Sequence, residues 1–246
     1  IERGHTNLQK LKAMSLKDDI PIQSQFRLSF NTVLNLINNH DSLAKRETIL
    51  RMNFDYFLKK KQSNKQVRIM ASYNNKVKQL MSLGYVYDDK LTEKGKFATR
   101  IYSNEILITE MFSNDLFKTL SDEEINILIA AIIYEPRRSD YFRLKGIDYI
   151  YQNIMKVVSR KNYLQKSINK LHLKRMINVV GGFTRGLEFK ELLDQCSLDE
   201  GDLIRLFKRI IDTNRQIQKA TQDYELKDRL QDCLDKIYRD VVKFEI

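Results

Sequence analysis

Residues 197–219 read SLDEGDLIRLFKRIIDTNRQIQK, and this stretch decides the fold class of the chain. Ser197, followed three positions later by Glu200, has the pattern of a capping box, which marks the start of a helix. Apolar residues then recur at the period of an amphipathic helix. They are Leu203, Ile204, Phe207, Ile210, Ile211 and Ile217. The sequence therefore predicts one long helix that buries one face and ends near residue 219.

The opposite face of this predicted helix is mostly basic and polar. It carries Arg205, Lys208, Arg209, Asp212, Gln216 and Lys219. Such a face suits contact with nucleic acid, because Lys and Arg side chains bind phosphates. The same spacing also suits a solvated face whose charged side chains pair at i,i+3 and i,i+4. Spacing alone leaves both interpretations open.

Helical patterns surround the long helix. A second capping box, SDEE at residues 121–124, opens an apolar helix through Ile125, Leu128, Ile129 and Ile132 that ends before Pro136. Further helices are predicted at about residues 141–159, 162–180, 187–195 and 223–243, with Gly181 and Gly182 breaking the second of them. The short helix at 187–195, the turn at Cys196 and Ser197 and the long helix have helix-turn-helix spacing. We predict a helical bundle over residues 104–246.

The first part of the chain predicts a different unit. Residues 1–25 lack sustained periodicity and are interpreted as a linker or the tail of a preceding domain. Three helices follow, from Phe26 to about residue 39 and at about residues 43–58 and 65–83, the last stopped by Gly84. Residues 85–87 and 97–101 are rich in β-forming residues and predict a hairpin. Three helices and a hairpin predict a winged helix over residues 26–103, in a mainly α protein.

The predicted hairpin has side chains that suit nucleic acid. Lys90, Lys94, Lys96 and Arg100 are candidates for phosphate contacts, although lysines also protect exposed strand edges from pairing. Tyr85, Tyr87 and Phe97 are candidates for stacking on bases, although such aromatic residues more often pack on neighbouring helices. Both alternatives stay open for each set.

The composition narrows the class of protein. The 246 residues carry a formal net charge of +11, which attracts polyanions. The surplus is concentrated in residues 1–105, with 19 Lys and Arg against 10 Asp and Glu, whereas residues 106–246 carry 24 against 22. Two cysteines without metal-ligand spacing indicate a reducing compartment, and no apolar run is long enough for a membrane span. We expect a cytoplasmic protein that does not bind membranes.

Sequence motifs for catalysis are missing. There is no G-x-x-x-x-G-K-[ST] phosphate loop, and the three histidines are widely separated without an H-E-x-x-H pattern. We therefore expect no catalytic residue, no metal site and no cofactor site in this chain.

Several segments resemble one family. PIQSQFRLSFNTVLNL at residues 21–36 and NFDYF at residues 53–57 are similar to the segment that follows the motor domains of superkiller-type DExH RNA helicases. DEGDLIRLFKR at residues 199–209 and KIYRDVV at residues 236–242 resemble the DSHCT helical domain that closes those proteins. The segments at residues 91–101 and 107–112 also resemble the family, and they lie between the others in the order that the family has. The resemblance therefore covers nearly the whole chain from residue 21.

The resemblance implies roles for parts of the chain. The first unit would support the motor, and the long helix would act as a "ratchet" facing single-stranded RNA that leaves the motor. Arg205 and Arg209, with Lys208 beside them, are similar to positions that touch nucleic acid, and Glu135 resembles an acidic position facing the same channel. ATP and Mg²⁺ would bind motor domains of the same polypeptide, which we expect before Ile1.

One feature departs from part of the family. Members that work with the exosome carry a large inserted arch, whereas here only about residues 58–66 occupy its place. This chain resembles the arch-less type, and recruitment by an arch is not expected.

Two other classes of protein stay open. A self-contained winged-helix and helix-turn-helix regulator would place residues 198–219 in the major groove of duplex DNA. A protein-interaction scaffold would bind no nucleic acid.

Overall fold

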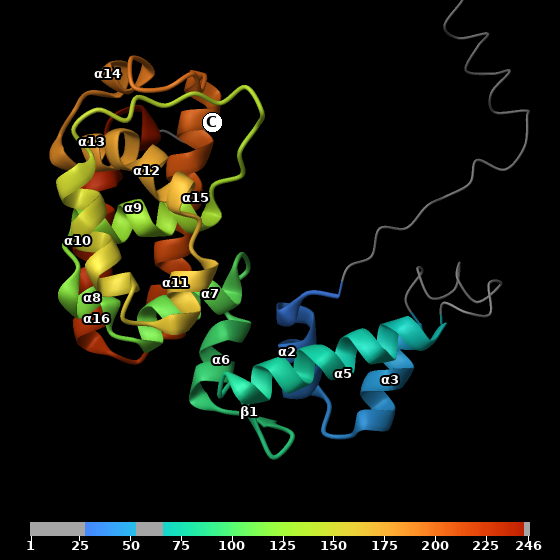
Figure 1. Ribbon diagram of the computed structural model, residues 1–246. Helices are drawn as coiled ribbons and strands as arrows, with labels where there is room; N and C mark the ends of the chain where they lie inside the picture. Colours follow the sequence, from blue (N-terminus) through green and yellow to red (C-terminus); the bar gives the residue numbers. More distant parts are fainter. Residues whose placement is uncertain (1–27, 53–65, 244–246) are drawn as a thin grey trace, which may run out of the picture.

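The computed structural model describes residues 28–52 and 66–243. The predicted linker at residues 1–25, the NFDYF segment and nearly all of residues 58–66 lie outside this range. The described chain is mainly helical, with one small hairpin and one long helix, which confirms the predicted fold class. Figure 1 shows two groups of elements, with α6 and α7 lying between them.

The first group corresponds to the predicted winged helix. Its elements are α2 (Phe30–Asn39), α3 (Leu43–Arg51), α5 (Gln66–Ser82), β1 (Val86–Tyr87), β2 (Lys90–Leu91) and α6 (Glu93–Thr99). The side chains of Ser29 and Ser42 cap α2 and α3 by accepting from the backbone three residues on. Arg46 of α3 is buried, donates to the carbonyl of His40 at 2.6 Å and pairs with Asp89 of the hairpin turn at 2.5 Å. The turn is thereby held to the helices.

The hairpin is shorter than predicted. Val86 pairs with Leu91 and Tyr87 with Lys90, around a two-residue turn in which Asp88 and Asp89 both have positive φ. The prediction of a second strand at residues 97–101 is wrong, because this segment belongs to α6 and its end. Thr92 caps α6 by accepting from the Gly95 N–H at 3.2 Å, and this local start outweighs the β propensity of the residues that follow.

Tyr85 and Lys94 join the first group to α7. Tyr85 is fully buried, and its hydroxyl donates to Glu110 at 2.9 Å. Lys94 pairs with the same carboxylate at 2.5 Å and donates to the Leu83 carbonyl at 2.9 Å. Burial raises the pKa of Tyr85, so its hydroxyl stays a donor. The candidate roles of Tyr85 in stacking and of Lys94 in phosphate binding are therefore wrong, because both side chains hold the two groups together.

The second group is a bundle of helices. Its elements are α7 (Glu105–Ser113), α8 (Leu116–Thr119), α9 (Asp122–Ile133), α10 (Asp148–Val158), α11 (Asn162–Ser167), α12 (Lys170–Met176), the π-helical turn η1 (Ile177–Gly181), α13 (Gly182–Arg185), α14 (Phe189–Leu193), α15 (Glu200–Ala220), α16 (Tyr224–Ile237) and the 3₁₀ turn η2 (Asp240–Lys243). The predicted helices at 141–159 and 162–180 are thus shorter or divided, and the one at 223–243 ends at Ile237.

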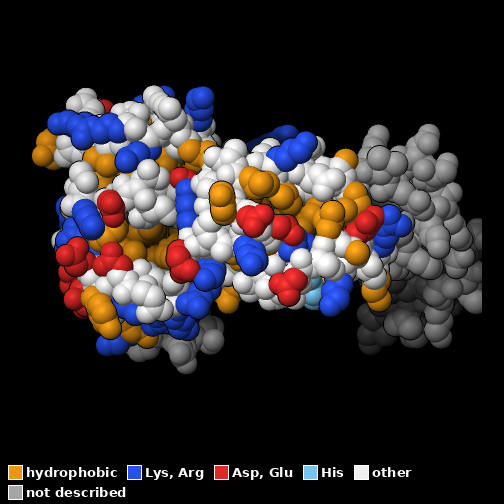
Figure 2. All heavy atoms as spheres, turned by 90° about the horizontal axis from the view of Figure 1, so that it is seen from below, with side chains coloured by type: hydrophobic (Ala, Val, Ile, Leu, Met, Phe, Trp, Pro, Cys, Tyr) orange, Lys and Arg blue, Asp and Glu red, His pale blue; other side chains and the backbone are white. Residues whose placement is uncertain are grey.

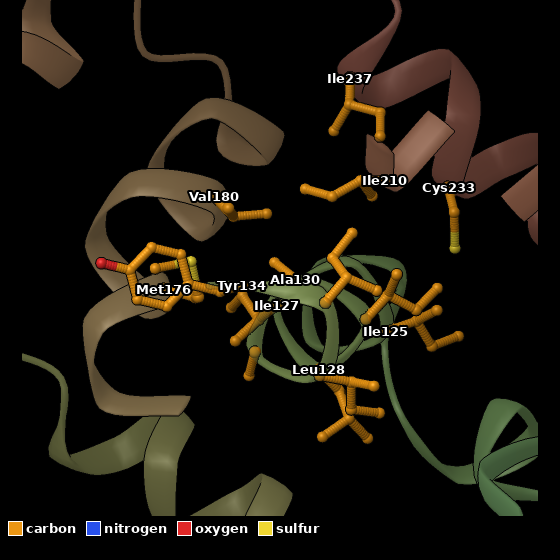
Figure 3. Packing of buried hydrophobic residues seen from close by; sticks show 14 of the residues in the cluster. Ile125, Ile127, Leu128, Ala130, Tyr134, Met176, Val180, Ile210, Cys233 and Ile237 are labelled. Carbon is orange, nitrogen blue, oxygen red and sulfur yellow. The ribbon is translucent and has the colours of Figure 1, made fainter. Parts of the chain in front are cut away.

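Helix α9 is the centre of the bundle. The predicted capping box of Ser121 and Glu124 is present, and ten of the twelve residues of α9 are buried. The helix packs against α12, η1, α15 and α16. Figure 3 shows its side chains pointing outward in several directions, toward Met176 and Val180 on one side and toward Ile210, Cys233 and Ile237 on another. A helix that is apolar all round is stable only when other elements surround it.

Two polar side chains of α9 fix the helices around it. Asn126 is fully buried; its side chain donates to the Cys233 carbonyl of α16 at 2.9 Å and accepts from Asn214 of α15 at 3.4 Å. Asp122, in the first turn of α9, pairs with Arg229 of α16 at 2.9 Å and with Lys236. Because buried polar groups require specific partners, these contacts set the register of α15 and α16 on α9.

Gly181 and Gly182 do not break the helical path, contrary to the prediction. The backbone continues from η1 into α13, and the helical path ends only at Gly186, whose φ is 112°. A Cβ atom on Gly181 would lie 2.9 Å from the Ile127 side chain, and one on Gly182 would lie 2.7 Å from the Leu187 side chain. These glycines therefore permit close packing of the π turn and α13 against their neighbours.

The predicted boundary between the two domains, at residues 103 and 104, stays a prediction. Two hydrophobic cores exist, but Ile101 packs in the core of the bundle, and Ile106 packs in the core of the first group. The segment between these residues is therefore shared by both cores.

Replacing Asn126 with Ala removes the donor to the Cys233 carbonyl and the acceptor for Asn214. We expect the free energy of unfolding to fall by about 2–3 kcal/mol, because buried partners are left unsatisfied. Urea denaturation followed by far-ultraviolet circular dichroism measures this. Asn153→Ala, on the half-exposed side of α10, should change it by about 0.5 kcal/mol or less. Equal unfolding midpoints for Asn126→Ala and the unchanged chain would contradict the role of this contact.

Burial, together with the neighbouring Asp122 carboxylate, raises the pKa of the Cys233 thiol to about 12. The unfolded thiol ionises near pH 8.5 and the folded one does not, so stability present below pH 8.5 is lost as the pH rises above it. Between pH 8 and pH 10 the loss from this group should be about 2 kcal/mol. Urea denaturation at both values should show a smaller loss in Cys233→Ala, and an identical loss would refute this explanation.

Candidate nucleic-acid interface

The N-cap of the long helix α15 lies two residues later than predicted. Asp199 is the N-cap and accepts from the Asp202 N–H at 2.7 Å. The predicted capping box of Ser197 with Glu200 is wrong, because Ser197 makes tertiary contacts with the segment before α10. Its hydroxyl accepts from the Tyr141 N–H at 2.8 Å, and its N–H donates to the Tyr141 carbonyl at 2.9 Å. These bonds fix the loop next to the first turn of α15.

The predicted amphipathic character of α15 is confirmed. Its buried residues are Leu203, Leu206, Phe207, Ile210, Ile211, Thr213, Asn214 and Ile217. Arg205, Arg209, Asp212 and Gln216 lie outside this face, and at 100° per residue they fall within roughly 60° of one another around the helix. These four residues form a line along α15, which we call the α15 stripe. Lys208 is half-buried on the flank of the stripe.

A hollow of about 310 Å³ lies where the end of α9 and the following loop meet the start of α15. Its charged lining consists of Arg137, Arg205 and Arg209 together with Glu135, Asp140 and Asp202. Tyr134, Pro136, Leu198 and Leu206 supply apolar walls. The hollow therefore presents three cations and three carboxylates beside a small apolar surface.

The charges in the hollow are paired. Arg209 pairs with Glu135 at 3.0 Å, although 74 positions separate them in the chain. Arg205 pairs with Asp202 at 3.3 Å, and Arg137 pairs with the same carboxylate at 2.5 Å. The structure thus brings together three of the predicted site residues, namely Arg205, Arg209 and Glu135. It does not place Lys208 in the lining of the hollow.

Sequence reasoning missed Arg137 and Asp202. Asp202 lies within the acidic start of α15, and the sequence marks it only as part of the segment that resembles the family. Arg137 follows Pro136 at the end of α9, and no local pattern indicates that this loop reaches α15. Their pairing depends on a contact over 65 positions, which only the packing of α9 on α15 creates.

Hydrogen bonds shape the loop that carries Arg137. The Tyr134 hydroxyl donates to Asp140, whose carboxylate also accepts from the Arg137 N–H at 2.7 Å. Burial raises the pKa of Tyr134, and the bond to Asp140 adds to this effect, so the hydroxyl remains a donor. Burial and the nearby Arg175 lower the pKa of His172, whose ring packs edge-on against Tyr134. At neutral pH this histidine is therefore uncharged, and the cations of the hollow are its arginines.

Among the basic residues of the hairpin region, Lys94 is engaged within the protein, whereas Lys90, Lys96 and Arg100 are exposed. Lys96 pairs with Glu93 at 2.7 Å, and Arg100 donates to the Lys219 carbonyl at the end of α15 at 2.9 Å. Figure 2 shows Lys and Arg mixed with Asp and Glu over the face in view, without one large basic area. On this face, charge alone therefore points to no single binding surface.

Among residues 28–52 and 66–243, no group of three or more potential ligands is arranged to hold a metal ion. Within the same ranges, no helix is long and apolar enough to cross a membrane.

Comparison with known proteins identifies relatives. The DSHCT (NUC185) domain family matches residues 88–245. The ATP-dependent RNA helicase mtr4 of Schizosaccharomyces pombe is 26% identical over 204 residues, which cover 75% of this chain and 18% of that protein. The human exosome RNA helicase MTR4 is 28% identical over 183 residues, which cover 66% of this chain and 17% of that protein. The antiviral helicase SKI2 of Saccharomyces cerevisiae is 24% identical over 243 residues, covering 86% and 19%.

The chain spans about a fifth of the length of these relatives. The match includes α15, the loop after α9 and therefore the whole hollow. The resemblance inferred from the sequence is confirmed: the chain belongs to the DSHCT domain family and is homologous to the C-terminal region of Ski2- and Mtr4-type DExH RNA helicases.

Proposed function

We propose that this chain guides single-stranded RNA as the strand leaves a DExH helicase motor, and that the strand contacts the hollow and the α15 stripe. The observation that carries the proposal is the cluster of Arg137, Arg205 and Arg209 at one end of an exposed helical stripe in a DSHCT domain. The relatives are named as RNA helicases, which favours RNA as the ligand.

The arginines of the hollow are accessible to a ligand despite their ion pairs. Arg205 is 69% exposed, and Arg209 is 34% exposed with a partner, Glu135, that is 82% exposed. Exposed pairs contribute only about 0.2–1 kcal/mol, so a phosphate can replace the carboxylate at small cost. A guanidinium then binds phosphate through two parallel hydrogen bonds.

The carboxylates give the hollow a second property. Three cations and three carboxylates balance, so attraction by net charge does not explain binding there. Glu135, once released from Arg209, is an acceptor for a base amino group or a ribose 2′-hydroxyl. The hollow therefore suits a strand whose phosphates and base edges are both exposed, as in single-stranded RNA.

The packing of α15 argues against a helix-turn-helix that reads duplex DNA. Such a motif presents the first residues of its second helix to the major groove. Here α15 packs mainly on α16 and α9 and also on α6 and η2, and Arg137 pairs with Asp202 beside its first turn. The exposed part of α15 includes the stripe next to the hollow as well as Gly201, Arg215 and Lys219, and the stripe with its hollow fits one strand better than a groove.

ATP hydrolysis belongs, in this proposal, to motor domains of the same polypeptide that bind ATP and Mg²⁺. The first group of helices would buttress that motor, and the bundle would hold the α15 stripe at its exit. In the full helicase, removal of the stripe's arginines should therefore lower unwinding and RNA-stimulated ATP hydrolysis together.

The double change Arg205→Ala/Arg209→Ala should weaken binding of a 12-nucleotide single-stranded RNA by at least about tenfold, because two charge-assisted contacts are lost. The slope of log affinity against log salt should become shallower by about 1.4, since each phosphate contact on a single strand contributes about 0.7. Fluorescence anisotropy across a salt series measures both quantities.

The matched control is Lys156→Ala/Lys166→Ala, which removes the same charge from exposed positions on α10 and α11. It should leave affinity within about twofold and the salt slope within about 0.3. Equal losses in both double variants would reduce the effect to net charge and contradict the site. Tighter binding of duplex DNA than of single-stranded RNA would favour the regulator, and absence of binding to either would favour a scaffold.

A further inference from the structure

The end of the α15 stripe that is farther from the hollow lies beside an exposed aromatic residue. Tyr102 follows α6, and its side chain is 76% exposed. Its backbone N–H donates to the side-chain oxygen of Gln216, the last residue of the stripe, at 2.9 Å. Tyr102 is therefore at the surface next to the same line of residues that begins with Arg205 and Arg209.

The backbone just before Tyr102 is fixed by contacts with α2, α15 and the core. Arg100 donates to the Lys219 carbonyl at the end of α15, and Asn31 of α2 donates to the Ile101 carbonyl at 3.0 Å. Ile101 itself is fully buried in the core of the bundle. A large ring on a fixed backbone loses little conformational freedom when a ligand packs against it, which is the condition for a good stacking platform.

The charges along the stripe change between its two ends. Arg205 and Arg209 are cationic, whereas Asp212 is an exposed carboxylate that accepts from Gln216 at 2.6 Å. A carboxylate repels phosphate, so the part of the stripe around Asp212 suits the bases of a strand better than its backbone, although the exposed Arg100 and Lys219 lie at the end of α15. An aromatic ring supplies the corresponding attraction, because bases stack on tyrosine without regard to sequence.

The spacing also fits one strand. Gln216 is eleven residues from Arg205, or about 16 Å along the helix at ~1.5 Å per residue. Stacked bases rise by about 3.4 Å, so this length corresponds to roughly five stacked nucleotides. A short strand therefore reaches from the arginines to Tyr102.

From these observations we propose that Tyr102 stacks on a base of the RNA strand and forms the far end of the binding surface that starts at Arg205 and Arg209. This inference rests on the proposed function. It assigns to the segment between the two groups of helices a role in RNA binding, in addition to joining their cores.

The test compares Tyr102→Ala, Tyr102→Phe and Tyr102→Leu in the 246-residue chain, with fluorescein-labelled 12-nucleotide oligo(A) and oligo(U) as probes. Tyr102→Ala should bind oligo(A) about 5- to 150-fold more weakly, the range expected for loss of one stacked base. Tyr102→Phe should bind within about twofold of the unchanged chain, and Tyr102→Leu should resemble Tyr102→Ala. The loss should be larger for oligo(A) than for oligo(U), because adenine has the larger ring system.

The salt slope separates this inference from the proposed function. Tyr102→Ala removes no phosphate contact, so its slope should equal that of the unchanged chain. Tyr149→Ala, at a tyrosine that is 77% exposed on α10, is the matched control and should bind normally.

Normal oligo(A) binding by Tyr102→Ala, or an equal loss in Tyr102→Phe, overturns the stacking role while the arginine site can still stand. Failure of the unchanged chain to bind either RNA overturns both proposals.

Discussion

The burial of α9 on all sides is the constraint on which the rest of the bundle depends. Ten of its twelve residues are buried, so the helix is stable only while α12, η1, α15 and α16 surround it. Within that apolar environment, Asn126 must find hydrogen-bond partners, and it finds them on α15 and α16. One buried amide therefore selects how two long helices lie on the central one.

The candidate interface follows from that arrangement. Because α15 is held against α9, the loop that leaves α9 reaches the first turns of α15. Glu135 then meets Arg209, and Arg137 meets Asp202. The apolar face of α15 is occupied by the core, and the α15 stripe lies on the face that is left outside it. The segment after α6 is bonded to the far end of the same helix, which adds Tyr102. A core contact thus determines a surface built from three separate parts of the sequence.

Local sequence signals predicted the secondary-structure elements better than they predicted the tertiary contacts. The capping box at Ser121, the amphipathic period of α15 and the stop at Gly84 are all local, and each lies where it was predicted. The strand predicted at residues 97–101 is absent because Thr92 caps a helix that runs through most of this segment. Ser197 does not cap α15 because its hydroxyl bonds to Tyr141 instead. The roles of Gly181 and Arg137 depend on neighbours more than fifty positions away, which no local pattern reports. Arg205 and Arg209 were found from helical period and resemblance together, and Glu135 from resemblance alone.

Photo-crosslinking tests the central claim most directly, because it locates RNA on the surface without a substitution. Single-stranded RNA containing 4-thiouridine would be bound to the chain, irradiated, and the crosslinked peptides identified by mass spectrometry. The account predicts crosslinks in the loop at 134–140, on the exposed side of α15 and at the segment that contains Tyr102. Crosslinks confined to residues 28–91, where much of the surplus positive charge lies, would contradict it.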